Sequence, residues 1–126
     1  MGEGTPHTEA VYNRIKNMNL PNIIDMVKKT TVRQYMNLAL GCDLIFTNDS
    51  GIVNIGAVFD KKILAIYSTV PKETRIDHYP SVIGLQVKSD CSPCYKLAHE
   101  CKFKDKCLNT ITVNEMFNKI TEMVGR

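Results

Sequence analysis

The sequence predicts an α/β fold in which short parallel strands alternate with helices. Three short apolar runs, at residues 43–47, 62–67 and 82–87, suit strands and are too short for helices. Helical patterns separate these runs, and strands joined through helices pair in parallel by right-handed crossovers. With 126 residues, the chain can bury the core of one domain but not of two.

The N-terminal part is expected to hold one helix and one short strand. Thr5 offers a capping hydroxyl and Pro6 suits a first helical turn, so we expect a helix over residues 7–19. After Pro21, residues 22–25 are a strand candidate. A second helix is expected from about residue 32 to Gly41.

Two helix starts carry the spacing of a capping box. Thr31 and Gln34 open the helix that ends at Gly41, and Thr112 and Glu115 open a final helix. Between them, a further helix is expected over residues 50–59. The final helix is expected to place four residues on its apolar side: Val113, Met116, Phe117 and Ile120.

The turn over residues 47–51, with the sequence Thr-Asn-Asp-Ser-Gly, is the best candidate for a functional site. It joins a strand to a helix, so the backbone N–H groups of Ser50, Gly51 and Ile52 are free to hold an anion or a sugar hydroxyl. Gly51 lets a ligand approach the backbone, and Asp49 can accept hydroxyl protons. An ordinary helix cap is the simpler alternative. In parallel sheets, however, ligands bind at the carboxyl ends of strands, which is where this turn falls.

Composition narrows the class of protein. A hydrophobic content of 44% with 23% charged residues is ordinary for a soluble domain. The net charge of +3 is spread along the chain, so we expect no nucleic-acid partner. No apolar run approaches the ~18 residues of a membrane span and no signal-peptide core follows Met1, so a cytoplasmic location is expected.

Four cysteines are gathered in the segment 91–107. Cys91, Cys94, Cys101 and Cys107 have the number of thiolates of a structural zinc site, but the later pair lacks the two-residue spacing typical of one. His99 could replace one of them. Disulfides and reduced, packed thiols are the alternatives. Each of these interpretations gives the segment a structural role.

The order of motifs resembles a known enzyme family. Residues 2–4, 22–26, 29–32 and 42–51 follow one another as in the C-terminal half of bacterial ADP-heptose lipopolysaccharide heptosyltransferases. Residues 62–67 are similar to the next strand of that family, and the cysteines are similar to the tail of many members. The resemblance covers nearly the whole chain.

This resemblance implies a Rossmann-like sheet, the C-terminal half of a GT-B glycosyltransferase. Such enzymes bind the lipopolysaccharide acceptor with an N-terminal domain, which carries the candidate base, and the nucleotide-sugar donor with the C-terminal domain. Transfer inverts the anomeric centre and requires no cofactor. By resemblance, Asp49 contacts the donor sugar, Ser50 and Gly51 lie against the diphosphate, and Thr30 lies beside the nucleotide base.

Two departures from the family pattern concern charge and loop length. The family usually carries histidine where this chain has Asn54, which can form hydrogen bonds but holds no positive charge. The loop after the next strand, 68–71, is shorter and lacks glycine. Lys72 and Arg75, which follow this loop, could meet a diphosphate and partly replace the missing charge.

We therefore expect residues 1–126 to form one partial nucleotide-sugar-binding domain, without its first strand and without an N-terminal acceptor domain. Its donor would be an ADP-heptose-like sugar and its pathway lipopolysaccharide core synthesis. We expect it to be inactive alone, and peripheral to the inner membrane in the full-length protein. The alternatives are a non-catalytic nucleotide- or glycan-binding module and an inactive fragment that self-associates through the sheet edge left open.

Overall fold

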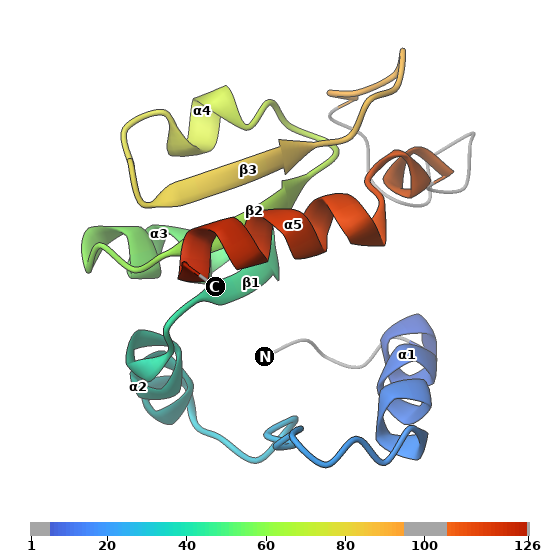
Figure 1. Cartoon of the computed structure of the whole chain (residues 1–126), viewed down its shortest axis with the longest axis vertical. Helices are drawn as coiled ribbons and strands as arrows, with labels where there is room; N and C mark the ends of the chain where they lie inside the picture. The colour runs from blue at the N-terminus through green and yellow to red at the C-terminus, as the bar shows by residue number, and fades with distance from the viewer. Residues whose placement is uncertain (1–5, 95–105, 126) are drawn as a thin grey trace. The chain divides into compact units, whose positions relative to one another are not determined.

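The computed structural model describes residues 6–94 and 106–125 (Figure 1). It divides into two compact units, Met1–Tyr35 and Met36–Arg126, which are described separately. Residues 2–4, the first motif of the resemblance, and the capping hydroxyl of Thr5 lie outside the described residues. No described helix is both long and apolar enough to cross a membrane.

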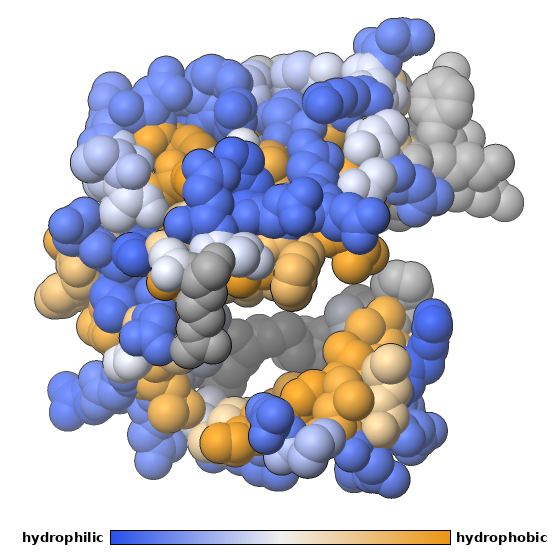
Figure 2. All heavy atoms as spheres, in the orientation of Figure 1, coloured by the Kyte–Doolittle hydropathy of each residue, from blue (hydrophilic) through white to orange (hydrophobic). Residues whose placement is uncertain are grey.

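The N-terminal unit is built on α1 (Pro6–Asn17), slightly shorter than the helix expected over 7–19. The chain leaves the helix at Asn19, whose positive φ of 47° is a left-handed conformation that asparagine tolerates. Apolar side chains gather on the surface of this unit (Figure 2), and Val11 and Ile15 of α1 are 44% and 46% exposed. These apolar side chains of α1 are therefore only partly covered.

The strand expected over residues 22–25 is absent from the described part of the chain, and that prediction was wrong. The carboxylate of Asp25 accepts hydrogen bonds from the Val27 N–H at 3.0 Å and the Lys29 ammonium at 2.9 Å. The Tyr12 hydroxyl donates to it at 3.0 Å. These bonds, first of all that from Lys29, lower the pKa of Asp25 to about 2. Local bonds thus fold the segment into turns instead of an extended strand.

The first capping box forms as expected. The Thr31 N–H donates to Gln34 Oε1 at 2.9 Å, and the Gln34 N–H donates to Thr31 Oγ1 at 3.3 Å. These reciprocal bonds open α2 (Val32–Gly41) and satisfy N–H groups that the helix cannot pair internally.

Three parallel strands form the sheet of the second unit, in the order β1-β2-β3 (Figure 1). They are β1 (Ile45–Asn48), β2 (Ile63–Tyr67) and β3 (Val82–Gln86). Ile45 pairs with Ile63, and Ile63 pairs with Val82, so the strands run in step. This arrangement confirms the α/β, Rossmann-like fold class.

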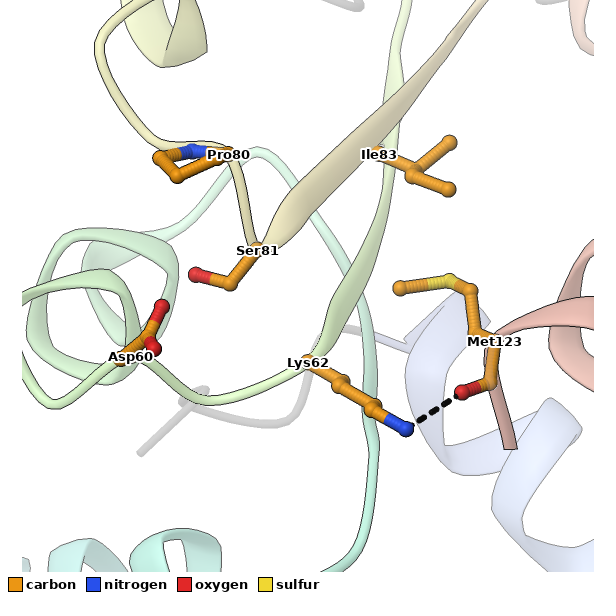
Figure 3. Close-up of a pocket in the computed structure, with 6 residues that line it drawn as sticks. All are labelled: Asp60, Lys62, Pro80, Ser81, Ile83 and Met123. Atoms are coloured by element: carbon orange, nitrogen blue, oxygen red, sulfur yellow. Dashed lines mark hydrogen bonds between the residues drawn. The ribbon is translucent and has the colours of Figure 1, made fainter. Parts of the chain in front are cut away.

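One face of the sheet packs against α5 (Val113–Val124), which follows the 3₁₀ turn Lys106–Thr110. The Thr112 hydroxyl accepts from the Glu115 N–H at 3.1 Å and caps α5 as expected. At the other end, the Lys62 ammonium donates to the Met123 carbonyl at 2.7 Å (Figure 3), placing a cation at the negative end of the helix dipole. The apolar core on this face consists of Leu64, Leu85, Val87 and Ile111, with Met116, Ile120 and Met123 packed on it.

The apolar side expected for α5 is half right. Met116 and Ile120 pack on the sheet, whereas Val113 and Phe117 are 75% and 66% exposed. Residues four apart lie about 40° apart around a helix, so a helix lying along a flat sheet buries only the middle of a wide apolar stripe. At the C-terminal end of α5, Met123 packs on the sheet as well.

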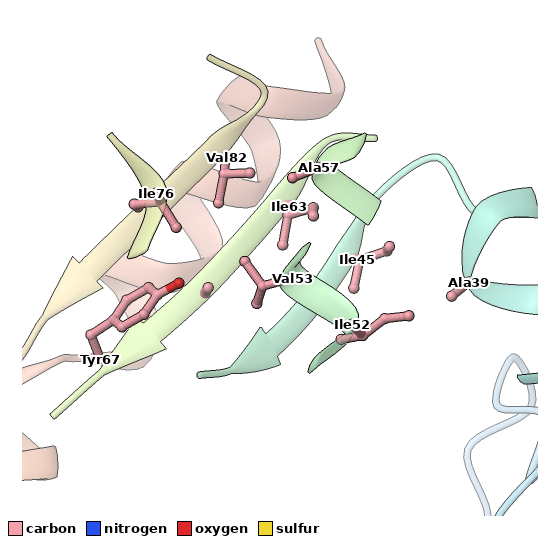
Figure 4. Packing of buried hydrophobic residues seen from close by; sticks show 10 residues of the cluster. Ala39, Ile45, Ile52, Val53, Ala57, Ile63, Tyr67, Ile76 and Val82 are labelled. Atoms are coloured by element: carbon pink, nitrogen blue, oxygen red, sulfur yellow. The ribbon is translucent and has the colours of Figure 1, made fainter. Parts of the chain in front are cut away.

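The opposite face carries α3 (Gly51–Val58) and α4 (Glu73–Ile76). Side chains alternate along β2, so Ile63 and Tyr67 point to this face (Figure 4). Ala65 belongs to the same buried cluster. The rest of this core comes from Ala39, Ile45, Ile52, Val53, Ala57, Ile76 and Val82. α3 approaches closely at Gly56, where an added Cβ would lie 2.8 Å from Ile63 Cδ1. The core thus fixes the position of the α3 N-terminus.

Candidate functional site

The turn singled out in the sequence lies between β1 and α3, at the carboxyl edge of the sheet. The Asp49 N–H donates to the Ile66 carbonyl at 3.1 Å, which extends the pairing of β1 with β2 by one residue. Ser50 is the N-cap of α3, with an extended backbone at φ −154° and ψ 165°. The strand therefore delivers Asp49 and Ser50 directly to the start of the helix.

The start of α3 offers backbone donors that no side chain satisfies. The first hydrogen bond of the turn runs from the Val53 N–H to the Ser50 carbonyl at 3.0 Å. Within the described residues, the N–H groups of Ser50, Gly51 and Ile52 meet no acceptor. The Ser50 hydroxyl does not cap the helix but lies 3.0 Å from Thr47 Oγ1. These donors and the helix dipole favour an anion here.

Gly51 leaves the turn open on its outer side. The residue is exposed, and no atom lies within 4 Å of the position that a Cβ would take. A ligand could therefore approach the backbone closely, and a larger side chain would block it without disturbing the fold.

Asp49 faces a cation from a different element. Arg75 of α4 places its Nε 3.8 Å from Asp49 Oδ2, with the two side chains 52% and 33% exposed. An ion pair this exposed contributes less than about 1 kcal/mol to stability. The pair therefore costs little to open, and its main effect is to bring a positive charge beside the start of α3.

Tyr67 is a polar group that the sequence did not single out. It ends β2 directly across from Asp49, since Asn48 pairs with Ile66. The residue is fully buried, and its hydroxyl finds no hydrogen-bond partner in the described structure. Burial, and after it the negative charge of Asp49, raises the pKa of Tyr67 to about 12, against the opposing charge of Arg75. An aromatic residue closing an apolar strand was the only signal for it.

A model for glycosyltransferase family 9, the heptosyltransferase family, matches residues 3–106 of this chain. The matched range includes the turn at residues 47–51, the cationic residues Lys72 and Arg75, and all three strands of the sheet. The chain belongs to glycosyltransferase family 9. No solved structure matches it.

Two curated members of this family are similar over nearly the whole chain. Both are lipooligosaccharide heptosyltransferase 2 of Campylobacter jejuni, from two strains. One is 27% identical over 116 residues and the other 26% over 117, covering 90% of this chain in each case. The chain spans about a third, 35%, of the length of these relatives.

The remaining predicted residues of this family 9 chain lie outside the turn itself. Asn54 lies on α3 and is exposed, and Thr30 is half-buried within the N-terminal unit. The side chain of Lys72 lies against β3, where its Cβ and Cδ would both be 3.2 Å from a Cβ added at Gly84. Of the two predicted cations, the structure brings Arg75 to Asp49, while no described contact joins Lys72 to it.

The cysteines are described only in part. Cys91, Cys94 and Cys107 are half-buried, and Cys101 and His99 lie outside the described residues. Within the described ranges, no three metal-ligating side chains come together. Cys91 Sγ lies 3.2 Å from the Ser89 hydroxyl. What the structure does show is a short turn anchored by Ser89.

Two hollows among the described residues, one within each unit, are not lined by residues 47–51. One of about 430 Å³ opens at the amino ends of β2 and β3 (Figure 3), the opposite edge of the sheet from Asp49. It is lined by Asp60, Lys62, Pro80, Ser81, Ile83 and Met123. Another, of about 300 Å³, lies within the N-terminal unit, between α1 and residues 19–27. The turn itself is exposed at Gly51, at the carboxyl edge of the sheet.

Proposed function

We propose that this chain is the donor-binding part of a heptosyltransferase-like glycosyltransferase that uses an ADP-sugar in lipopolysaccharide core synthesis. The observation that carries this proposal is the set of unsatisfied N–H groups at Ser50, Gly51 and Ile52, beside Arg75. A nucleoside diphosphate presents the charge and the oxygen acceptors that such a site prefers.

In this proposal, Arg75 supplies the charge that Asn54 lacks. A diphosphate on the α3 N-terminus would lie near the guanidinium, which can give bidentate hydrogen bonds to phosphate oxygens. The exposed Arg75–Asp49 pair can open at small cost, so Arg75 can turn to the ligand. Asp49 is then free to accept hydrogen bonds from hydroxyls of the donor sugar.

Family membership and the relatives' names support a nucleotide-sugar transferase. This chain spans 35% of the length of the relative. The part of the enzyme that corresponds to the rest of that length would bind the acceptor and carry the general base. Asp49 lies on the donor side, whereas an inverting transfer needs a base on the side opposite the leaving group. We therefore propose inverting transfer only when the two parts act together, on the cytoplasmic side of the inner membrane.

Titration calorimetry of the full chain with ADP, UDP, GDP and an ADP-sugar tests the donor site. We expect selective binding of the adenine nucleotides and a loss of affinity of at least about tenfold in Gly51→Val, because the side chain would occupy the space of the diphosphate. Gly41→Val is the matched control, since a Cβ at either glycine meets open space. No binding at millimolar nucleotide, or equal binding by Gly51→Val, would refute the proposal.

Arg75→Gln tests the role of the cation separately. Losing one charge-assisted contact should weaken ADP binding about five- to tenfold and flatten its dependence on salt. Arg33→Gln, on α2 and outside the turn, controls for net charge. An unchanged salt dependence in Arg75→Gln would remove Arg75 from the site while leaving the α3 N-terminus in it.

The neutral Asn54 favours a second candidate, a non-catalytic nucleotide- or glycan-binding module. An exposed asparagine cannot stabilise the charge that develops on a leaving diphosphate as a cation would. The two functions differ in one observable. The enzyme should transfer sugar when combined with an acceptor-binding part, and Asn54→His should raise that rate, whereas the module should bind nucleotide without transfer.

We also propose that the open edge of β1 supports self-association. β1 is the edge strand of the described sheet, and its Phe46 is 50% exposed. An apolar strand with unpaired N–H and C=O groups is a template for pairing with a second copy.

A further inference from the structure

Four residues at the carboxyl edge of β2 and β3 form a continuous chain of hydrogen bonds. The Lys72 N–H donates to Gln86 Oε1 at 2.9 Å, and Gln86 Nε2 donates to Ser92 Oγ at 3.0 Å. The Ser92 hydroxyl in turn donates to the Ser68 carbonyl at 2.7 Å. Each group in this Gln86 chain (Ser68, Lys72, Gln86, Ser92) thus has a defined donor or acceptor role, and all four are half-buried.

The near end of the Gln86 chain acts on α4. Lys72 is the N-cap of that helix, and its carbonyl accepts from the N–H groups of Arg75 at 2.9 Å and Ile76 at 3.0 Å. Its own N–H is a group that no helix can satisfy internally, and Gln86 satisfies it. A helix of four residues is too short to be stable by itself, so contacts from outside must hold it.

Packing holds α4 from below. At Gly84 an added Cβ would lie 2.6 Å from Ile76 Cδ1 and 3.2 Å from Lys72 Cβ, so the helix lies directly on the backbone of β3. This contact fixes the height of α4 above the sheet. The hydrogen bond that the Lys72 N–H donates to Gln86, two residues further along the same strand, fixes where the helix begins.

The far end of the Gln86 chain, at Ser92, lies in the cysteine segment. Ser92 stands between Cys91 and Cys94, in a turn where the Ser92 N–H donates to the Ser89 carbonyl at 2.9 Å. The hydroxyl of Ser92 therefore joins this turn to both the end of β3 and the loop after β2. No other described hydrogen bond connects the cysteine turn to α4.

From this arrangement we infer that Gln86 and Ser92 are positioning residues, which hold α4 so that Arg75 stands beside Asp49. For the ligand of Arg75, this inference rests on the proposed function. It gives the cysteine turn a role in the donor site without metal ligation: its serine is the far anchor of the helix that carries the cation.

Hydrogen exchange of the full chain, without ligand, tests the hold on α4. In Gln86→Leu the amides of Lys72, Arg75 and Ile76 should exchange at least about tenfold faster, since the N-cap bond is gone. Ser92→Ala, which removes only the far link, should accelerate the same amides less. Thr110→Val is the matched control, because Thr110 Oγ1 accepts from the Lys88 N–H at 2.9 Å and takes no part in the Gln86 hydrogen bonds. Unchanged exchange in Gln86→Leu would overturn the inference.

A double-mutant cycle with Arg75 tests whether the effect on binding passes through the cation. We expect Gln86→Leu to weaken ADP binding about fivefold in the wild-type background and less than about twofold in Arg75→Gln. A purely structural effect of Gln86 would be equal in both backgrounds and would overturn the positioning role. If wild-type protein binds no nucleotide, the proposed function fails, and the exchange experiment still decides whether the Gln86 chain holds α4.

Discussion

Replacing Tyr67 with phenylalanine should stabilise the protein and change how its stability depends on pH. The Tyr67 hydroxyl is fully buried and has no described hydrogen-bond partner. A hydroxyl removed from water without a new partner costs about 1–3 kcal/mol. Phenylalanine keeps the ring in contact with the core and removes that cost. We expect Tyr67→Phe to raise the free energy of unfolding by about 1–2 kcal/mol at neutral pH.

The pH dependence follows from the raised pKa of Tyr67. The neutral phenol is favoured in the folded protein, where the pKa of Tyr67 is about 12, over the unfolded chain, where an unperturbed tyrosine has a pKa of 10.0. The stability that this difference contributes is fully present below pH 10 and is lost as the pH rises through 12. Tyr67→Phe has no such group, so its advantage over wild type should grow by about 1 kcal/mol near pH 11.

Urea unfolding at several pH values between neutral and about 11 measures both effects. Other groups also titrate in that range, so the quantity to follow is the difference between wild type and Tyr67→Phe. Tyr79→Phe, in the loop after α4 and only half-buried, is the matched control. A destabilised Tyr67→Phe would show that the hydroxyl has a partner. A difference that stays constant with pH would show that Tyr67 ionises as easily folded as unfolded.

Two further predictions concern the end helix and the sheet edge. Thr112→Ala should lower the free energy of unfolding by about 1 kcal/mol, because it removes the bond to the Glu115 N–H, and Thr112→Ser should restore it; a melting curve compares the three. Light scattering should detect dimers that form with increasing protein concentration and that Phe46→Lys suppresses, because a charge on an edge strand opposes pairing; a wild-type chain that stays monomeric at high concentration contradicts this.

The parts of the fold that were predicted correctly are those decided by neighbours in sequence. The capping boxes at Thr31 and Thr112 bring donor and acceptor together within three residues, so local chemistry is sufficient. The three apolar strands were predicted within two residues of their ends, because the β-branched and apolar runs that form them have no other way to bury their side chains. Predictions that required a partner far away in the sequence were more often wrong.

The failed strand at residues 22–25 shows this dependence. Ile23 and Ile24 have high strand propensity, yet they are 51% and 84% exposed. A strand gains its hydrogen bonds only from a neighbouring strand, and none pairs with this segment within the described residues. The Asp25 carboxylate, in contrast, accepts hydrogen bonds from Val27, Lys29 and Tyr12, all of which lie nearby in the sequence. Local hydrogen bonds therefore determine the conformation of residues 22–25, and strand propensity alone could not have predicted this.

In the candidate site, too, the features set by neighbouring residues could be predicted and those set by distant contacts could not. The turn and the importance of Gly51 could be predicted, because a strand, a polar turn and a helix are consecutive in sequence. That Arg75 meets Asp49 could not, since it requires α4 to lie on β3 at Gly84 and β1 to pair with β2 in one register. The same register places Tyr67 across from Asp49. Arg75 from α4 and Tyr67 from β2 thus lie near one carboxylate, and the close approach of α4 to Gly84 is part of what brings Arg75 there.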